Sequence, residues 1–281
     1  MGYHYLPQYY LKGFSGADGK TIWVYDKRKK CKFATQVKSI ANETGFYSPE
    51  VESYLADHVE EPAKAVLKKI RRRHQISTED KQVFSEYMIC MIIRVPRGKE
   101  RVKQLAPSVA EDVRQEIDRQ LSAALLEEPK KAAFIEGRRS EVHRMIDRYA
   151  KDPPDDIWLR TIPPERWPRA STALSRMRWK FLTFDRYPAF LTSDNPVFYF
   201  PSLGIGRPES EVTFPLSSNV ALWATGQANL AEDFLPTNAQ VVRELNRRTA
   251  STATRYLFHS TDEEGVLRLL NQRSWRLNML T

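Results

Sequence analysis

Hydrophobic residues change their spacing once along the chain, and this change limits the folds that are open to it. Between Val51 and Ile70 they recur at intervals of three and four residues, the spacing of one buried helix face. After Trp179 the period becomes two, and residues 180–184 have the alternation that is typical of a strand. Helices gathered in one part of a chain and strands in another are typical of the α+β class. We therefore predict an α+β fold.

The expected sheet is mixed or antiparallel and takes strands from both ends of the chain. One strand is predicted at 21–25, and the others lie within 180–260, among them a hairpin of 211–216 with 220–224. A central helical segment covers about 49–150.

Two features mark the helices of this segment. Pro62 is expected to kink the first helix or to restart it, because proline removes an amide donor and disfavours helical geometry before it. A second helix follows a cap at Ser77. Because its run from Val83 to Val95 has few polar breaks, we expect it to be the central helix of the core.

The length of 281 residues is long for one domain and short for two. We expect a single α+β domain over 1–281 with a helical insertion at 100–150. The insertion is charged and alanine-rich, and it divides into two helices near Pro129. Helices of this composition often pack against a second copy, so a homodimer is a possible assembly.

Charge and cysteine usage limit the partners and the compartment. Forty-four basic against thirty-five acidic residues give a net charge of +9, which suits nucleic acid, although an ordinary basic protein is the alternative. Cys31 and Cys90 lie far apart and have no metal-ligand spacing, which favours a reducing compartment. The longest apolar run, 87–93, is too short to span a bilayer, and the N-terminus lacks the pattern of a signal peptide. We expect a cytoplasmic protein with no membrane partner.

The chain opens with an aromatic segment that must dock on the rest of the fold. Pro7 suits the first turn of a helix, which places Tyr10 and Phe14 on one face. His4 lies just ahead of this helix. It is either a capping or packing residue, or a general base or metal ligand.

Residues 189–200 form an aromatic and β-branched run that predicts a strand, a tight polar corner and a second strand. The corner consists of Thr192, Ser193, Asp194, Asn195 and Pro196. Its aspartate and asparagine can bond to nearby backbone amides, and its proline fixes φ. The corner would present a carboxylate, two hydroxyls and an amide at the rim of a sheet. An Asx-turn that only ends a strand is the alternative.

Charged residues at the ends of the helices are further candidates. Arg94 closes the central helix, and its guanidinium should find a carboxylate, either Asp194 or one of Glu60 and Glu61, unless it escapes to solvent. The two glutamates lie at the expected kink, where they would be aimed at a site or would form a solvated acidic turn. The basic turn that includes Arg71 and Arg73 is available for phosphate.

Four motifs together resemble a family catalogued as domain of unknown function 4238. They are His4-Tyr5-x-Pro7-x-x-Tyr10-Leu11-x-x-Phe14, Arg94 with Pro96, Thr192-Ser193-Asp194-Asn195-Pro196, and Leu245-Asn246. The likeness spans most of the chain, but the family has no established activity, so it implies shared architecture and little chemistry. It also implies that one site contains His4, Arg94, Asp194 and Asn246.

Our first hypothesis is an enzyme that hydrolyses a phosphodiester of nucleic acid, for example in a prokaryotic defence or toxin system. Asp194 with Glu60 or Glu61 would bind Mg²⁺ or Mn²⁺, His4 would be the general base, and Arg94 would stabilise charge on phosphate. The catalytic set is completed by Asn246. The predicted substrate-binding residues are Tyr5, Tyr10, Arg71, Arg73, Thr192, Ser193 and Asn195.

Two other functions remain open. In a non-catalytic module that binds nucleic acid or protein, the same residues would be structural. A hydrolase or transferase that acts on a small nucleotide is the third candidate. A concave pocket with His4, Arg94 and Asp194 pointing into it favours an enzyme, and a filled contact favours the module.

Overall fold

The computed structural model describes residues 2–186, 190–227, 231–272 and 274–280. The predicted turn that ends at Pro188 and the predicted strand start at Ala189 lie outside this part. The chain divides into two compact units. The first unit comprises Met1–Arg97 and Ile162–Thr281, and the second comprises Gly98–Thr161. The predicted insertion at 100–150 lies within the second unit.

A five-stranded sheet is the centre of the first unit. Its order is β10-β5-β9-β8-β7, and β10 pairs with β5 in parallel while the other pairs are antiparallel. The strands are β5 (Arg178–Thr183), β7 (Phe198–Tyr199), β8 (Glu211–Ser217), β9 (Val220–Thr225) and β10 (Phe234–Pro236). The predicted mixed sheet and the predicted hairpin of β8 and β9 are thus confirmed.

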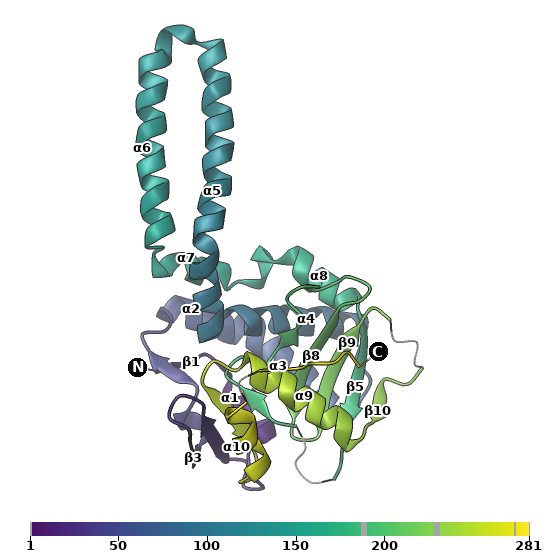
Figure 1. Ribbon diagram of the computed structural model, residues 1–281. Helices are drawn as coiled ribbons and strands as arrows, with labels where there is room; N and C mark the ends of the chain where they lie inside the picture. The colour runs from purple at the N-terminus through teal and green to yellow at the C-terminus, as the bar shows by residue number, and fades with distance from the viewer. Residues whose placement is uncertain (1, 187–189, 228–230, 273, 281) are drawn as a thin grey trace. The chain divides into compact units, whose positions relative to one another are not determined.

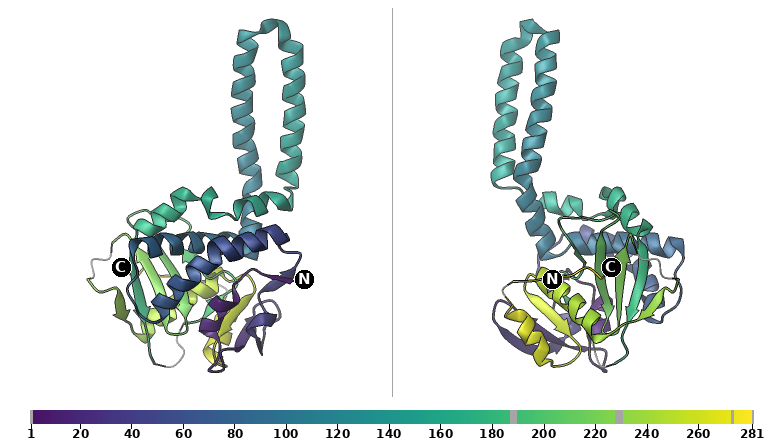
Figure 2. Two further views of the ribbon diagram at one scale, coloured as in Figure 1. Left: turned by 180° about the vertical axis from the view of Figure 1, so that it is seen from behind. Right: turned by 45° about the vertical axis from the view of Figure 1, so that its right-hand side comes forward.

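Alternate residues of this sheet pack on opposite layers, as the period of two requires. Phe214 stacks on Phe84 of α4 (Thr78–Ile93), with ring centroids 6.2 Å apart. On the other face, Leu182 and Trp223 belong to a core cluster with Leu245 of α9 (Ala239–Thr252). Figures 1 and 2 show α9 on one side of the sheet and α4 on the other.

A smaller antiparallel sheet has the order β3-β2-β11-β6. Its strands are β2 (Thr21–Asp26), β3 (Cys31–Gln36), β6 (Thr192–Ser193) and β11 (Tyr256–His259). The helix α10 (Glu264–Leu270) contributes Val266 to the core beside Tyr25. The N-terminal strand therefore pairs with a late strand, as predicted. The predicted strand pair around the polar corner is split, because β6 belongs to this sheet and β7 to the larger one.

The remaining short elements of the N-terminal part come before α2 in the sequence. The strands β1 (Gly2–His4) and β4 (Asn42–Thr44) pair with each other. Between them in sequence lie α1 (Gln8–Leu11) and the 3₁₀ turns η1 (Lys12–Phe14) and η2 (Val37–Ser39). Tyr10, Leu11 and Phe14 are buried, so the predicted docking face exists.

The helical segment contains the irregularity that Pro62 led us to expect. The helix α2 (Pro49–Tyr54) runs into the π-helix η3 (Leu55–Glu60), and α3 (Glu61–Arg71) restarts there. Next, α4 begins with a capping box of Ser77 and Asp80, and its residues from Phe84 on are nearly all buried. The turn η5 (Pro164–Arg166) and α8 (Pro168–Arg176) lead to β5.

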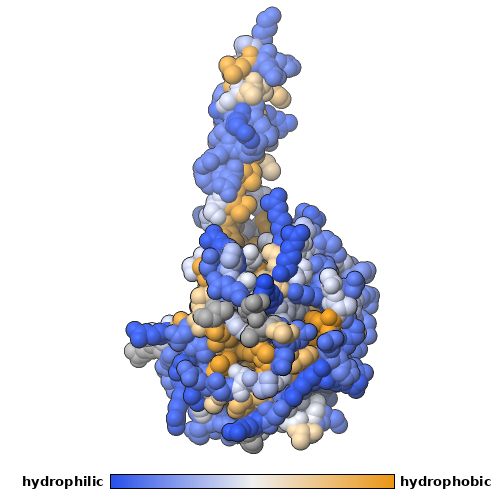
Figure 3. All heavy atoms as spheres, turned by 90° about the vertical axis from the view of Figure 1, so that its right-hand side faces the viewer, coloured by the Kyte–Doolittle hydropathy of each residue, from blue (hydrophilic) through white to orange (hydrophobic). Residues whose placement is uncertain are grey.

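The second unit contains the two predicted helices, which divide near Pro129. They are α5 (Pro96–Glu127), which belongs to this unit from Gly98 on, and α6 (Ala132–Lys151), joined by the 3₁₀ turn η4 (Pro129–Lys131), and α7 (Asp155–Thr161) follows. His143 Nε2 lies 2.9 Å from Asp118 Oδ1 across the two long helices. Figure 3 shows one face of the pair of long helices, α5 and α6, on which hydrophobic residues form small groups among hydrophilic ones. Among the described residues, no helix combines the length and apolar character that crossing a bilayer requires.

Candidate functional site

Tyr10 fastens the N-terminal segment to both sheets. Its hydroxyl donates to Pro215 O of β8 at 2.8 Å and lies 2.6 Å from Thr192 Oγ1 of β6. Its ring stacks on Phe214 with centroids 5.2 Å apart. The hydroxyls of Tyr10 and Thr192, both predicted to bind substrate, therefore face each other in the protein interior.

Arg71 also holds the N-terminal segment. Its guanidinium donates to the carbonyls of Leu216, Tyr9 and Tyr10 at 2.8, 2.9 and 2.7 Å. A Cβ at Gly13 would lie 2.2 Å from Arg71 Nη2 and 2.9 Å from Leu216 O, so this packing requires glycine. Three backbone carbonyls thus accept the hydrogen bonds that we predicted Arg71 would donate to a phosphate group. Arg73 lies on the surface and pairs with Asp185.

Arg94 is buried and takes Glu60 as its carboxylate partner, which confirms one of the predicted pairs. Its Nη1 donates to Glu60 Oε1 at 2.5 Å, and its Nη2 donates to His4 O at 2.7 Å. Tyr47 Oη accepts from Arg94 Nε at 3.3 Å and donates to Arg94 O at 2.7 Å. This arrangement joins the π-helix, the end of α4 and the N-terminal strand. Burial of the charged guanidinium is compensated by the carboxylate.

The imidazole and the main-chain carbonyl of His4 have different hydrogen-bond partners. His4 Nε2 lies 3.1 Å from Lys38 O, whereas the main-chain oxygen binds Arg94. Glu52 supplies a second carboxyl group whose ionisation is influenced by Arg94 and Glu60. Burial raises the pKa of Glu52, to which Glu60 also contributes by its negative charge, while Arg94 lowers it. The neighbouring Glu61 pairs with Lys64 at 3.0 Å, and both side chains are exposed.

Asp194 is surrounded by backbone amides. Its Oδ1 accepts from Thr254 N at 2.8 Å, and its Oδ2 accepts from Arg255 N at 2.7 Å and Tyr256 N at 3.0 Å. Its side chain fixes the start of β11 beside β6. Burial raises the pKa of Asp194 to about 6, and the three amides oppose this shift.

The rest of the polar corner is also engaged. Ser193 Oγ accepts from Asn195 N at 3.2 Å, and Asn195 Nδ2 donates to Thr252 O at 3.0 Å. Asn246 on α9 accepts from Leu191 N at 3.1 Å. These bonds tie the crossing between the two sheets to α9. They match the alternative in which the corner is a structural turn.

The predicted site residues thus fall into two groups. One contains His4, Glu60 and Arg94, and the other contains the polar corner with Asn246. In the described part of the chain, no three His, Cys, Asp or Glu side chains lie where they could together hold a metal ion. Binding of Mg²⁺ or Mn²⁺ stays a prediction. Burial raises the pKa of Tyr5, and the negative charge of Asp194 adds to this shift.

A basic pocket at the edge of the larger sheet was not predicted. Its volume is about 370 Å³, and it is lined by Ile76, Lys81, Arg178, Trp179, Lys180, Phe181 and Asp233. Lys180 Nζ donates to Glu232 O at 2.7 Å and lies 3.5 Å from Asp233 Oδ1. Burial lowers the pKa of Lys81; Asp233 opposes this shift and Lys180 adds to it. The sequence signal was the alternation of basic and aromatic residues at 178–181.

The model of a known protein family matches residues 3–263, and that family is described as proteins of unknown function, DUF4238. The chain belongs to this family. The predicted membership is therefore confirmed over the N-terminal motif, the polar corner and Asn246. The match also includes the basic pocket. No curated protein and no solved structure matches the chain.

Proposed function

We propose that the first unit is a non-catalytic module that binds the phosphate backbone of nucleic acid, and that the family motifs hold its fold. The observation that carries this proposal is the distribution of charge. Residues 98–161 contain thirteen lysines and arginines and thirteen aspartates and glutamates, so they are neutral overall. The excess of nine positive charges, 44 against 35, therefore belongs entirely to the first unit. Phosphate binding by basic residues is the main source of affinity in non-specific nucleic-acid binding.

The engagement of the motif residues supports the non-catalytic form of the function. Asp194 accepts three backbone amides, Arg94 is buried against Glu60, and Asn246 accepts a backbone amide. A catalytic group needs a reach of about 3 Å to a reacting atom. Asp194 and Asn246 instead contact main-chain amides, and Arg94 contacts Glu60 and the carbonyl of His4.

The basic pocket is the position that we propose for a phosphate group. It brings together Lys81, Arg178 and Lys180, with Asp233 as the acidic lining residue. Lys81 Nζ donates to Met177 O and Lys180 Nζ to Glu232 O, but an ammonium group has three N–H donors, so these carbonyls do not use all of them. Lysine and arginine side chains bind phosphate by charge and by hydrogen bonds. Trp179 is buried, so the pocket suits a backbone phosphate better than a stacked base.

The salt dependence of binding to labelled DNA and RNA oligonucleotides tests this proposal. In the double variant Arg178→Gln/Lys180→Gln, the slope of log K against log salt should decrease by about 1 for each lost phosphate contact. The matched control is Lys130→Gln/Lys151→Gln, which removes the same charge from the second unit. An equal loss in both variants contradicts the proposed pocket.

The same oligonucleotides test the hydrolase hypothesis. They are incubated with Mg²⁺ or Mn²⁺ and, separately, with chelator, and the products are separated by size. Intact strands in every condition support a binding module. Cleavage that requires metal and is lost in Asp194→Asn favours the hydrolase and contradicts our proposal.

A further inference from the structure

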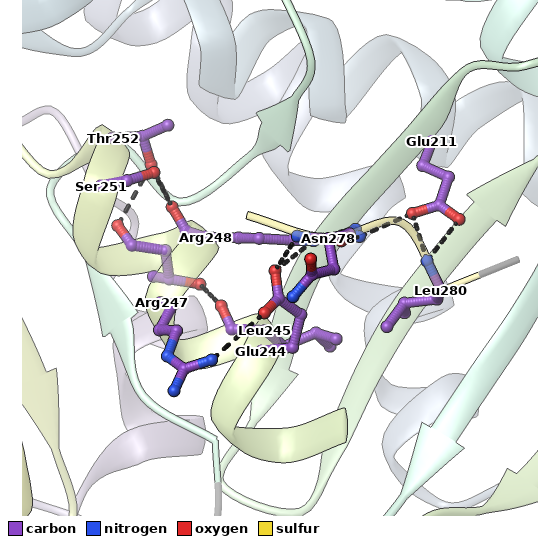
Figure 4. A network of polar contacts seen from close by, with 10 residues as sticks. Glu211, Glu244, Leu245, Arg247, Arg248, Ser251, Thr252, Asn278 and Leu280 are labelled. Carbon is purple, nitrogen blue, oxygen red and sulfur yellow. Dashed lines mark hydrogen bonds and ion pairs between the residues drawn. The ribbon is translucent and has the colours of Figure 1, made fainter. Parts of the chain in front are cut away.

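Side chains of the first unit hold the main chain of residues 277–280. Asn278 N donates to Glu244 Oε1 at 2.8 Å. Leu280 N donates to Glu211 Oε1 and Oε2 at 2.8 and 3.1 Å, and Arg248 Nη2 donates to Asn278 O. Figure 4 shows the segment between these three charged side chains. It has neither helical nor strand structure of its own.

The three charged side chains lie deep in the fold. Arg248 and Glu211 are completely buried and form an ion pair at 2.7 Å. The Arg248 guanidinium also lies 5.3 and 5.1 Å from the ring centroids of Phe198 and Phe200. Charges that are removed from water in this way must be compensated by good partners. Part of that compensation comes from the amides and the carbonyl of 277–280.

The three charged side chains contact the main chain of the described residues 277–280 and not their polar side chains. Asn278 and Leu280 are two residues apart, so in extended backbone their amides point the same way. The two glutamates take the place of the carbonyls that a neighbouring strand would offer. The side chain of Leu280 packs on the core cluster that contains Trp223 and Leu245, whereas Met279 is 37 % exposed. The contacts therefore involve main-chain groups at two alternate positions and one apolar side chain, which suits an extended peptide.

We propose that Glu211, Glu244 and Arg248 form a receptor groove for an extended peptide, and that residues 277–280 are its resident ligand. The family match supports a separable ligand, because it includes all three groove residues and ends at 263, before the resident segment. The groove accordingly accepts the same segment, residues 277–280, from a second copy of this chain when its own segment is displaced. This inference is independent of nucleic-acid binding.

The test uses the full chain and a labelled, acetylated and amidated peptide of residues 274–280. In the double variant Asn278→Pro/Leu280→Pro, the resident segment loses both amide donors, and the groove becomes available. We expect the peptide to bind this variant with one-to-one stoichiometry and at least about tenfold more tightly than the wild-type chain, in which the resident segment competes.

Backbone methylation of the peptide provides the matched control. Methylation of the nitrogen of Asn278 or Leu280 should weaken binding at least about tenfold, because each amide donates to a carboxylate. Methylation at Met279 should have little effect. Equal binding of the three methylated peptides, or no gain of binding by a folded double variant, overturns the proposal.

Hydrogen exchange tests whether the three charged side chains hold the resident segment. The amides of Asn278 and Leu280 should exchange at least about tenfold more slowly than the amide of Met279. In Glu244→Gln, protection of Asn278 should decrease more than that of Leu280. Equal and rapid exchange of all three amides shows that the groove does not hold the segment, and it overturns the proposal.

Discussion

Replacing Arg94 by methionine should destabilise the first unit strongly. The change keeps most of the aliphatic stem and removes the guanidinium, whose partners are Glu60, His4 O and Tyr47. Glu60 then remains largely buried without a countercharge, and the carbonyl of His4 loses its donor. Loss of one partner from a buried ion pair costs about 3–5 kcal/mol of the free energy of unfolding.

The two adjacent glutamates supply a matched comparison. Glu60→Gln removes the charge that compensates Arg94, and it should cost about 1–3 kcal/mol because the amide oxygen can still accept a hydrogen bond. Glu61→Gln removes a carboxylate that is 71 % exposed, and it should change stability by less than about 0.5 kcal/mol. The double variant Arg94→Met/Glu60→Gln should cost less than the sum of the single changes, because it leaves no unpaired buried charge.

Urea unfolding followed by tryptophan fluorescence measures these differences. With an m-value of about 3 kcal/mol per M, the Arg94→Met change lowers the urea midpoint by about 1 to 1.7 M. If the urea midpoint of Arg94→Met lies within about 0.3 M of wild type, the Arg94–Glu60 pair does not stabilise the contact between the π-helix, α4 and the N-terminal strand.

Three further predictions concern packing, pH and the corner. Gly13→Ala should cost about 1–3 kcal/mol, because its Cβ would meet Arg71 and a carbonyl, whereas Gly137→Ala, with open space around it in α6, should stabilise by about 0.5–1 kcal/mol; thermal melts compare them. The pKa of Asp194 is about 6 in the folded chain and 3.8 ordinarily, so its contribution to stability is present below pH 4 and is lost as pH rises through 6. A ¹³C titration of its carboxyl group with a midpoint below pH 4 contradicts this shift. Asn246→Ala should cost about 1–3 kcal/mol by leaving a buried amide unsatisfied, and unchanged urea stability contradicts it.

The sequence predicted features that depend on neighbouring residues. The uninterrupted apolar run of α4 indicated a buried helix, and the restart at α3 followed from the chemistry of Pro62. Burial also required a carboxylate for Arg94, and the candidates included Glu60. Each of these predictions uses local spacing or a single energetic requirement.

Features that depend on distant pairing were beyond this reasoning. The two-residue strands β6 and β7 carry no periodic signal, and their assignment to different sheets depends on β11 and β8. The basic pocket was missed because Lys81 lies about a hundred residues from Arg178 and Lys180. For His4, residue type suggested ring chemistry, but its carbonyl makes the contact with Arg94.

The π-helix η3 changes how helical faces must be counted along the chain. A π turn accommodates one additional residue, which offsets the helix that follows by about 100°. Glu52 and Glu60 are eight positions apart, but this offset makes them equivalent to a heptad pair, which deviates from alignment by only about 20°. The negative charge of Glu60 contributes to raising the pKa of Glu52, which agrees with that geometry. Without the π turn, eight positions of regular α-helix would place the two carboxylates about 80° apart, whereas deletion of one residue within 55–60 would restore seven-residue spacing and keep them on the same side.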